Sequence, residues 1–129
     1  MVDALVERYR ARGLLDDRVY AEGRAKSLLR QGRPRAEIKR RLVAKGVKED
    51  DITNALESLS EDQSEPDFAA AVAFARRRRL GPFRVKDRVA FRDRDLAALG
   101  RAGFSYDIAR RVLAAETVET LEAALHGDA

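Results

Sequence analysis

Two adjacent carboxylates, Asp16 and Asp17, are the residues whose types and spacing come nearest to catalytic or metal-binding chemistry. A carboxylate pair can hold a divalent cation or share acid–base work. Adjacent aspartates at the start of a helix, however, more commonly cap the helix and complement its dipole. The sequence has one histidine, His126, no cysteine and no Gly-rich phosphate loop. We therefore expect Asp16 and Asp17 to be structural, and we expect no catalysis, no cofactor and no bound metal.

Anion binding is the chemistry that the sequence supports better, and residues 30–35 are its leading candidate. Gly32 makes a turn here, and Pro34 is tolerated in the first turn of the helix that follows. A helix N-terminus presents unpaired backbone N–H groups, and arginines add bidentate recognition of phosphate or carboxylate. The predicted contact residues, in this segment and beyond it, are Arg24, Lys26, Arg30, Arg33, Arg35, Lys39, Arg40, Arg76, Arg77, Arg78, Arg79, Arg84 and Lys86.

Positive and negative charges are segregated along the chain. Residues 24–45 hold nine basic residues and one acidic residue, a net charge of +8, whereas residues 46–68 have a net charge of −7. The alternation repeats with +7 over residues 76–94 and −4 over residues 115–129. Clustered lysines and arginines concentrate anions and favour phosphate backbones. Consecutive residues point in different directions on a helix, so only part of each basic run can serve one surface.

A pattern of helix end, glycine and new helix occurs twice and indicates an all-α fold. Gly46 and Gly103 each follow an apolar helix end and precede an apolar residue, which in the second copy is Phe104. A glycine at this position adopts the left-handed conformation that ends a helix, and we expect Phe104 to fold back into the core. In both copies a leucine follows the glycine by 10 residues. The sequence therefore predicts repeated helical units and no sheet.

The same pattern divides the chain into helical modules. Gly13 ends one helix, another runs from about Lys86 to Gly103, and Tyr20 packs between helices. The acidic, proline-terminated residues 60–66 have the composition of a linker, and we place the boundary between the modules there.

Three segments of the chain carry motifs that occur in a recognisable order. Residues 12–22 contain a Leu-Leu-Asp-Asp element, residues 32–47 combine a basic loop with a Lys-Gly-Val helix end, and residues 103–106 read Gly-Phe-Ser-Tyr. In this order and rough spacing, residues 13–113 resemble the RecX family, the regulatory proteins that modulate the recombinase RecA.

The resemblance implies tandem three-helix repeats in an elongated or curved arrangement. Family members usually carry another helical repeat ahead of the Leu-Leu-Asp-Asp element, where this chain has only residues 2–12. We therefore predict five segments: residues 1–13, the last helix of a largely missing N-terminal repeat; residues 14–59, the first complete three-helix repeat; residues 60–66, an acidic linker; residues 67–115, a second three-helix repeat; and residues 116–129, a C-terminal helix and tail.

The resemblance implies a function in homologous recombination. It implies tandem repeats that bind along the groove of the RecA–DNA filament, restrain strand exchange and RecA coprotease activity, and contact single- or double-stranded DNA through phosphates. Two other interpretations stay open: a helix-turn-helix protein that acts directly on DNA, and a charged scaffold that binds no nucleic acid. Because the sequence has no cysteine, no signal-like N-terminus and no apolar run of about 20 residues, we expect a cytoplasmic protein without membrane contact. We also expect a monomer.

Overall fold

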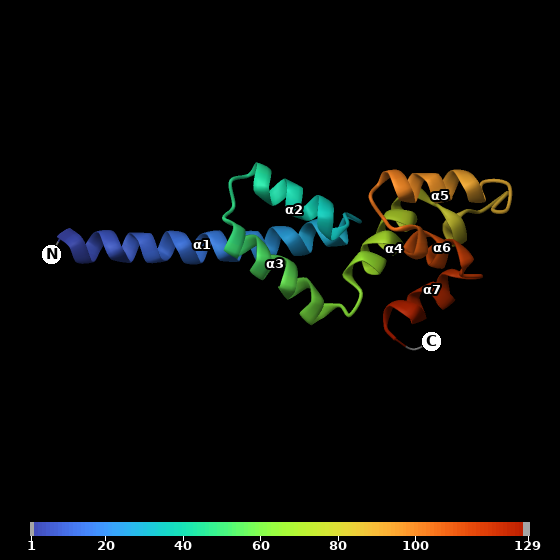
Figure 1. Ribbon diagram of the computed structural model, residues 1–129. Helices are drawn as coiled ribbons and strands as arrows, with labels where there is room; N and C mark the ends of the chain where they lie inside the picture. Colours follow the sequence, from blue (N-terminus) through green and yellow to red (C-terminus); the bar gives the residue numbers. More distant parts are fainter. Residues whose placement is uncertain (1, 128–129) are drawn as a thin grey trace.

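The computed structural model describes residues 2–127, with side chains from residue 16 onward, and within that range every regular element is a helix. This confirms the all-α fold predicted from the sequence. No helix among the described residues is long and apolar enough to cross a membrane. The helices form two successive groups along the chain, arranged in an elongated molecule (Figure 1).

The first group has three helices: α1 (Val2–Arg30), α2 (Arg35–Ala44) and α3 (Glu49–Asp62). Helices α2 and α3 lie against the C-terminal half of α1, whose N-terminal half extends away from both groups (Figure 1). One apolar stripe from each helix faces the others, as helical periodicity requires. The buried core consists of Ala21, Ala25, Leu28, Ile38, Leu42, Ile52, Ala55 and Leu59.

The second group is built on α4 (Pro66–Arg78), α5 (Arg92–Arg101) and α6 (Tyr106–Ala114), with α7 (Val118–Leu125) beside α4. A 3-10 turn, η1 (Gly81–Phe83), packs against α4 and α6. The larger core of this group includes Phe68, Val72, Phe74, Leu99, Phe104, Val112, Leu113 and Leu121.

The two groups meet through tight contacts at helix ends. Gly32, just after α1, has a φ of 92°, and a Cβ atom placed on it would lie 2.7 Å from the backbone nitrogen of Phe74. Gly103, just after α5, has a φ of 103°, and its Cβ would lie 3.3 Å from the ring of Pro34. Leu29 packs against both cores. The groups therefore touch where only glycine allows the backbone to approach this closely.

Several helix ends have the conformation that the local sequence favours. Gly46 and Gly103 both have positive φ, as predicted. Ser105 caps α6, because its Oγ accepts a hydrogen bond from the backbone nitrogen of Ile108 at 3.2 Å. Phe104 is buried, with its ring centroid 5.8 Å from that of Phe74. Its expected core role is confirmed.

Three expected features of α1 are wrong. The helix does not end at Gly13 but runs without interruption to Arg30, so Asp16 and Asp17 lie in its interior and cap nothing. A glycine inside a helix costs only about 1 kcal/mol relative to alanine, whereas a break would leave unpaired backbone groups at two new helix ends. Tyr20 is exposed rather than packed between helices.

The segment before α5 also differs from expectation. Residues 84–87 are irregular, residues 88–91 form a turn, and the helix begins at Arg92 rather than near Lys86. Asp87 has a φ of 58°, a left-handed conformation through which an α-helix cannot pass. At the join between the two groups, α3 continues to Asp62 and α4 begins at Pro66, so only residues 63–65 lie outside the helices.

Candidate nucleic-acid and partner interface

The thirteen predicted contact residues separate into two sets in the structure. Five of them form an ion pair with a carboxylate of the same chain: Lys26 with Asp62, Arg33 with Glu37, Arg35 with Asp67, Arg76 with Glu122, and Arg84 with Asp95. The other eight have no carboxylate within 4 Å among the described residues; they are Arg24, Arg30, Lys39, Arg40, Arg77, Arg78, Arg79 and Lys86. The second set is free to meet an external anion.

The start of α2 binds an anionic group, and that group is a carboxylate of the same chain. The Oδ1 atom of Asp67, at the start of α4, accepts hydrogen bonds from the backbone nitrogen of Arg35 at 3.0 Å and from its Nε at 3.1 Å. The unpaired N–H and the basic side chain that favour an external phosphate are thus occupied by a carboxylate 32 residues away. Arg35 therefore ties the two groups of helices together.

The arginine run Arg76–Arg79 stays helical through Arg78, and its members point in different directions as helical geometry demands. The guanidinium of Arg76 lies 5.3 Å from the ring centroid of Phe83, and that of Arg78 lies 4.9 Å from the ring centroid of Phe74. Arg79 has a φ of 56° and ends α4 in the left-handed conformation. The run is an ordered helix end and does not form a basic arm.

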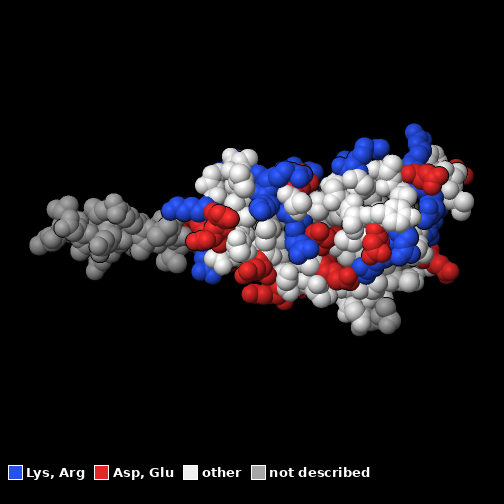
Figure 2. Space-filling model, viewed as in Figure 1, with Lys and Arg blue, Asp and Glu red and all other residues white. Residues whose placement is uncertain are grey.

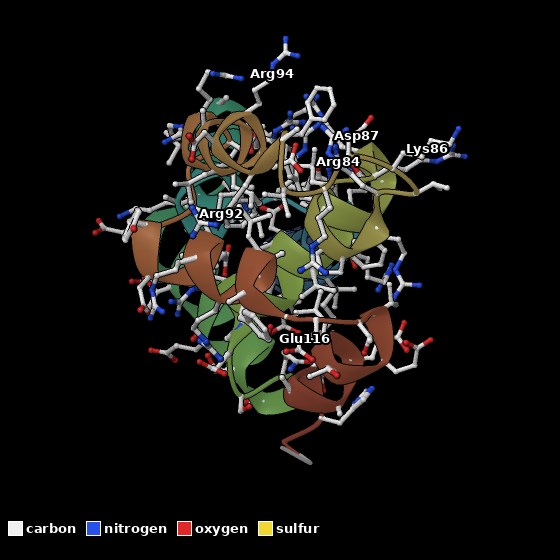
Figure 3. All side chains as sticks on the ribbon, turned by 90° about the vertical axis from the view of Figure 1, so that its right-hand side faces the viewer. Arg84, Lys86, Asp87, Arg92, Arg94 and Glu116 are labelled. Carbon is white, nitrogen blue, oxygen red and sulfur yellow. The ribbon has the colours of Figure 1, made fainter. Side chains whose placement is uncertain are left out.

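Residues 84–91 form a basic loop at the far end of the second group. Figure 3 shows Lys86 reaching into solvent from this loop, and Arg94 doing so from the neighbouring helix α5. Arg84 points inward instead and donates two hydrogen bonds of 2.7 Å to Asp95. The guanidinium of Arg88 binds the carbonyls of Leu113, Ala115 and Glu116, at and just beyond the end of α6. Arg84 and Arg88 therefore hold the loop in place, and Lys86 is left exposed for contact with a partner.

Asp95 is the one buried carboxylate among the described residues, at 1% exposure. Besides Arg84, the backbone nitrogen of Gly81 donates to it at 2.9 Å. Burial raises the pKa of Asp95, but the hydrogen bonds from Arg84 and Gly81, together with the positive charges of Arg84 and Arg94, lower it by more, so the pKa lies below its ordinary value. Asp95 is therefore ionised at neutral pH and anchors η1 and the loop after it to α5.

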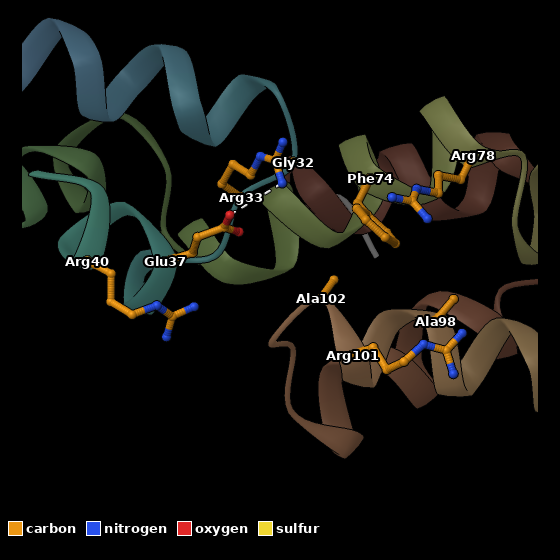
Figure 4. Close-up of a pocket in the computed structure, with 9 residues that line it drawn as sticks. All are labelled: Gly32, Arg33, Glu37, Arg40, Phe74, Arg78, Ala98, Arg101 and Ala102. Atoms are coloured by element: carbon orange, nitrogen blue, oxygen red, sulfur yellow. Dashed lines mark hydrogen bonds and ion pairs between the residues drawn. The ribbon is translucent and has the colours of Figure 1, made fainter. Parts of the chain in front are cut away.

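The two groups of helices enclose a pocket of about 300 Å³ (Figure 4). Four arginines from both groups line it, and Glu37 is the one acidic residue in its lining. Glu37 accepts a hydrogen bond from Arg33 at 3.3 Å and bonds of 3.2 Å from Arg41. The complete lining is Gly32, Arg33, Glu37, Arg40, Phe74, Arg78, Ala98, Arg101 and Ala102. This inter-repeat pocket brings together arginines from both basic blocks of the sequence.

Sequence reasoning missed Arg101, which lines the inter-repeat pocket from the last turn of α5. It lies outside both basic blocks, so no local charge pattern marks it. Only the packing between the two groups of helices places it in the same pocket lining as Arg40, 61 residues earlier in the chain. Such a long-range approach leaves no signal in spacing or composition.

Basic and acidic side chains also separate in space. On the face shown in Figure 2, lysines and arginines follow the upper edge over α2 and α5, whereas acidic side chains gather at the lower edge of the first group, over α3. The first turn of α3 holds three acids, Glu49, Asp50 and Asp51, which suit the positive end of its helix dipole. The segregation along the sequence thus becomes a polarity of the folded molecule.

Comparison with known proteins identifies the first group of helices. Residues 16–56 match the model of the second three-helix domain of RecX. The chain is 43% identical over 114 residues to the regulatory protein RecX of Myxococcus xanthus, a match that covers 87% of this chain and 60% of that protein. It is 36% identical over 106 residues to the regulatory protein RecX of Agrobacterium fabrum, covering 81% of this chain and 54% of that protein.

No solved structure was found to match the chain. The chain spans between half and two thirds of the length of the two RecX proteins it matches. The residues of the Leu-Leu-Asp-Asp element, the basic loop and the first glycine helix end, on which the resemblance rests, fall in or beside the matched domain. The resemblance inferred from these residues is confirmed: the chain is similar to regulatory proteins of the RecX family over most of its length.

Proposed function

We propose that this chain is a regulator of the RecA recombinase that binds the groove of the RecA–DNA filament and inhibits strand exchange and coprotease activity. Similarity to RecX proteins over most of the chain is the observation that carries this proposal. The division of basic residues adds to it, because the arginines and lysines without an internal carboxylate lie on both groups of helices. A monomer that presents two such groups can contact neighbouring RecA protomers or nearby phosphates at the same time.

The proposed mode of action is occupation of the groove. The two groups of helices correspond in this proposal to the repeats at residues 14–59 and 67–115, preceded by the last helix of another repeat and followed by a C-terminal helix. Lysines and arginines of α1, α2 and α4 would meet phosphates or acidic side chains of the filament. A protein lying there excludes the incoming duplex or a repressor substrate. The site supplies binding and no chemistry.

The direct test is DNA-dependent ATP hydrolysis by RecA on single-stranded DNA, titrated with this chain. We expect hydrolysis to fall at near-stoichiometric ratios of this chain to RecA. Arg30→Glu reverses an exposed charge that has no carboxylate partner among the described residues. Because it removes one charge-assisted contact, it should raise the concentration of the chain needed for half-maximal inhibition about three- to tenfold.

Lys48→Glu is the matched control for that experiment. It makes the same change in net charge at an exposed position ahead of α3, among acidic residues and outside the basic blocks. The control should inhibit like the unmodified chain. A chain that leaves hydrolysis unchanged at every ratio would refute the proposed regulation, and equal weakening by Arg30→Glu and Lys48→Glu would refute the assignment of the basic residues.

A further inference from the structure

We propose that the loop of residues 84–91 is a protein-docking site, whose exposed valines enter a shallow apolar pocket that has carboxylates at its border. The inference rests on the proposed function, under which the partner that carries this pocket is a RecA protomer of the filament. It deepens that function by adding a contact at the end of the molecule that lies farthest from α1 and α2 (Figure 1).

Two valines of this loop are the most exposed large apolar side chains in the part of the chain that the structure describes. Val85 is 88% exposed and Val89 is 89% exposed, whereas the next, Val19, is 69% exposed. Single exposed apolar side chains are common on protein surfaces. Val85 and Val89, however, are only four residues apart, so the chain keeps their Cα atoms within about 14 Å of each other. Both can therefore enter one protein interface.

The loop that carries the valines is anchored from the inside. Arg84 donates two hydrogen bonds of 2.7 Å to the buried carboxylate of Asp95, and its guanidinium lies 4.2 Å from the ring centroid of Phe91, the last residue of the loop. Arg88, in the middle of the loop, donates hydrogen bonds of 2.8 and 2.9 Å to backbone carbonyls at and just beyond the end of α6. Each exposed valine directly follows one of these two anchored arginines.

An anchored loop presents apolar side chains to a partner at a low entropic cost. A flexible loop loses conformational freedom when it binds, and that loss subtracts from the affinity. A valine side chain has a single, stiff torsion, so little further freedom is lost when it is buried. Two arginines and a buried carboxylate thus fix a segment whose most apolar side chains face solvent. This arrangement suits a preformed binding surface better than a simple connection between helices.

The charges around the valines favour a protein partner over nucleic acid. Between residues 85 and 94 the exposed charged side chains are Lys86, Asp87, Arg92, Asp93 and Arg94, a net charge of only +1. The two aspartates would repel phosphates, and a phosphate backbone offers no apolar surface to bury a valine. Protein interfaces instead combine an apolar centre with a polar rim. Lys86 and Arg94 reach into solvent in different directions (Figure 3), and both would meet carboxylates on such a rim.

The test measures the kinetics of binding to RecA filaments assembled on immobilised single-stranded DNA, by biolayer interferometry. The variant is Val85→Thr with Val89→Thr, which keeps the branched shape of both side chains and replaces one methyl group in each by a hydroxyl. We expect the affinity to fall about tenfold, because each hydroxyl must lose its water on entering an apolar pocket. The loss should arise almost entirely from faster dissociation.

The matched control is Val19→Thr with Val43→Thr, the same chemical change at exposed valines of α1 and α2. The control pair should bind filaments like the unmodified chain, and circular dichroism of both pairs should match it. Equal weakening by the control pair, or unchanged filament binding by the loop pair, would overturn this inference and leave the proposed function in place. An unmodified chain that binds no filament would overturn both.

Two further arms test the chemistry of the partner. Lys86→Gln with Arg94→Gln should slow association about three- to tenfold and reduce its dependence on salt, with little change in dissociation, as expected for charges at the rim of an interface. Faster association would overturn the carboxylates at the border of the pocket. Binding of a fluorescein-labelled oligothymidylate without RecA should be the same for the loop valine pair and the unmodified chain. A tenfold loss there would overturn the protein partner in favour of nucleic acid.

Discussion

At the scale of single residues, charged side chains in this protein have two distinct roles. Some arginines are used inside the molecule: Arg84 meets the buried Asp95, and Arg111 meets Glu65 through two hydrogen bonds of 2.9 and 3.1 Å. The bond from Arg111 lowers the pKa of Glu65 below its ordinary value. Other arginines, such as Arg30 and Arg40, face solvent without a carboxylate partner in the described part of the chain. The basic composition therefore overstates the surface available to a partner.

Replacement of Asp95 by asparagine tests the internal role. The change leaves Arg84 without its counter-charge and should lower the free energy of unfolding by about 2–4 kcal/mol, since breaking a buried ion pair is costly and Arg84 keeps some access to water. Urea unfolding at neutral pH measures the loss. Asp93→Asn is the control: Asp93 lies on the same helix but is 99% exposed, and its substitution should change stability by less than about 0.5 kcal/mol.

The ion pair of Arg84 and Asp95 also predicts that the stability of the fold depends on pH. Because the pKa of Asp95 is lower in the folded state than its ordinary value of 3.8, its ionisation stabilises the fold above that value, and this stabilisation is lost as the pH falls through the folded-state pKa. The stability difference between the unmodified chain and Asp95→Asn should therefore be largest at neutral pH and shrink below about pH 4. A difference that stays constant from pH 7 to pH 3 would contradict the assignment.

At the scale of helices and turns, the two groups are joined by glycine helix ends. Gly32 and Gly46 have similar positive φ values of 92° and 80°, but only Gly32 has a neighbour where a Cβ would lie. Gly46→Ala should cost about 1 kcal/mol from backbone strain alone. Gly32→Ala should cost at least about 2 kcal/mol more, because the added methyl group meets the backbone of Phe74 and must push the groups apart.

Thermal unfolding of both alanine variants checks this prediction, and the difference between them isolates the contact between the groups. Equal losses of stability in the two variants would show that the close approach of Gly32 to Phe74 does not make Gly32 less tolerant of a Cβ atom than Gly46.

What could be predicted from the sequence at this scale depended on the range of the interactions. Gly46 and Gly103 were placed correctly because a helix end is determined by a few consecutive residues. The start of α5 was not, because it depends on Asp87 in a left-handed conformation and on a loop held by Arg88 against residues 113–116.

The candidate site could likewise be predicted only where it depends on residues close together in the sequence. The charge runs singled out Arg33, Arg40 and Arg78, which line the inter-repeat pocket, and their contact with a partner stays a prediction. They could not reveal that Arg35 is occupied by Asp67, or that Arg101 completes the lining, because both facts follow from packing between groups far apart in the chain. A periodic pattern indicates which face of a helix is buried, but it does not indicate which element packs against that face.

At the scale of the whole molecule, two apolar cores share one side chain. Leu29 packs against both cores, whereas Leu56, also partly buried, packs against the first core alone. Leu29→Ala should lower stability by about 1–2 kcal/mol, less than a fully buried leucine would, and should also uncouple the two groups. Leu56→Ala should destabilise the first group without that second effect.

Native-state hydrogen exchange distinguishes the two leucine variants. In the unmodified chain, amides of Leu59 and Val112, one in each core, should exchange with similar free energies of opening. Leu29→Ala should lower both values and separate them. If Leu29→Ala affects only the amide of Leu59, the two groups are already independent and Leu29 is not their link.

The spatial separation of charge gives the molecule an electric dipole. A protein with arginines along one edge and acids of α3 near the other is turned by the field of a polyanion before it touches it (Figure 2). Of the many orientations in which two bodies can collide, those that present the basic edge over α2 and α5 are then favoured. Added salt screens this field beyond about 10 Å, so it should slow the encounter well before it shortens the lifetime of the bound state.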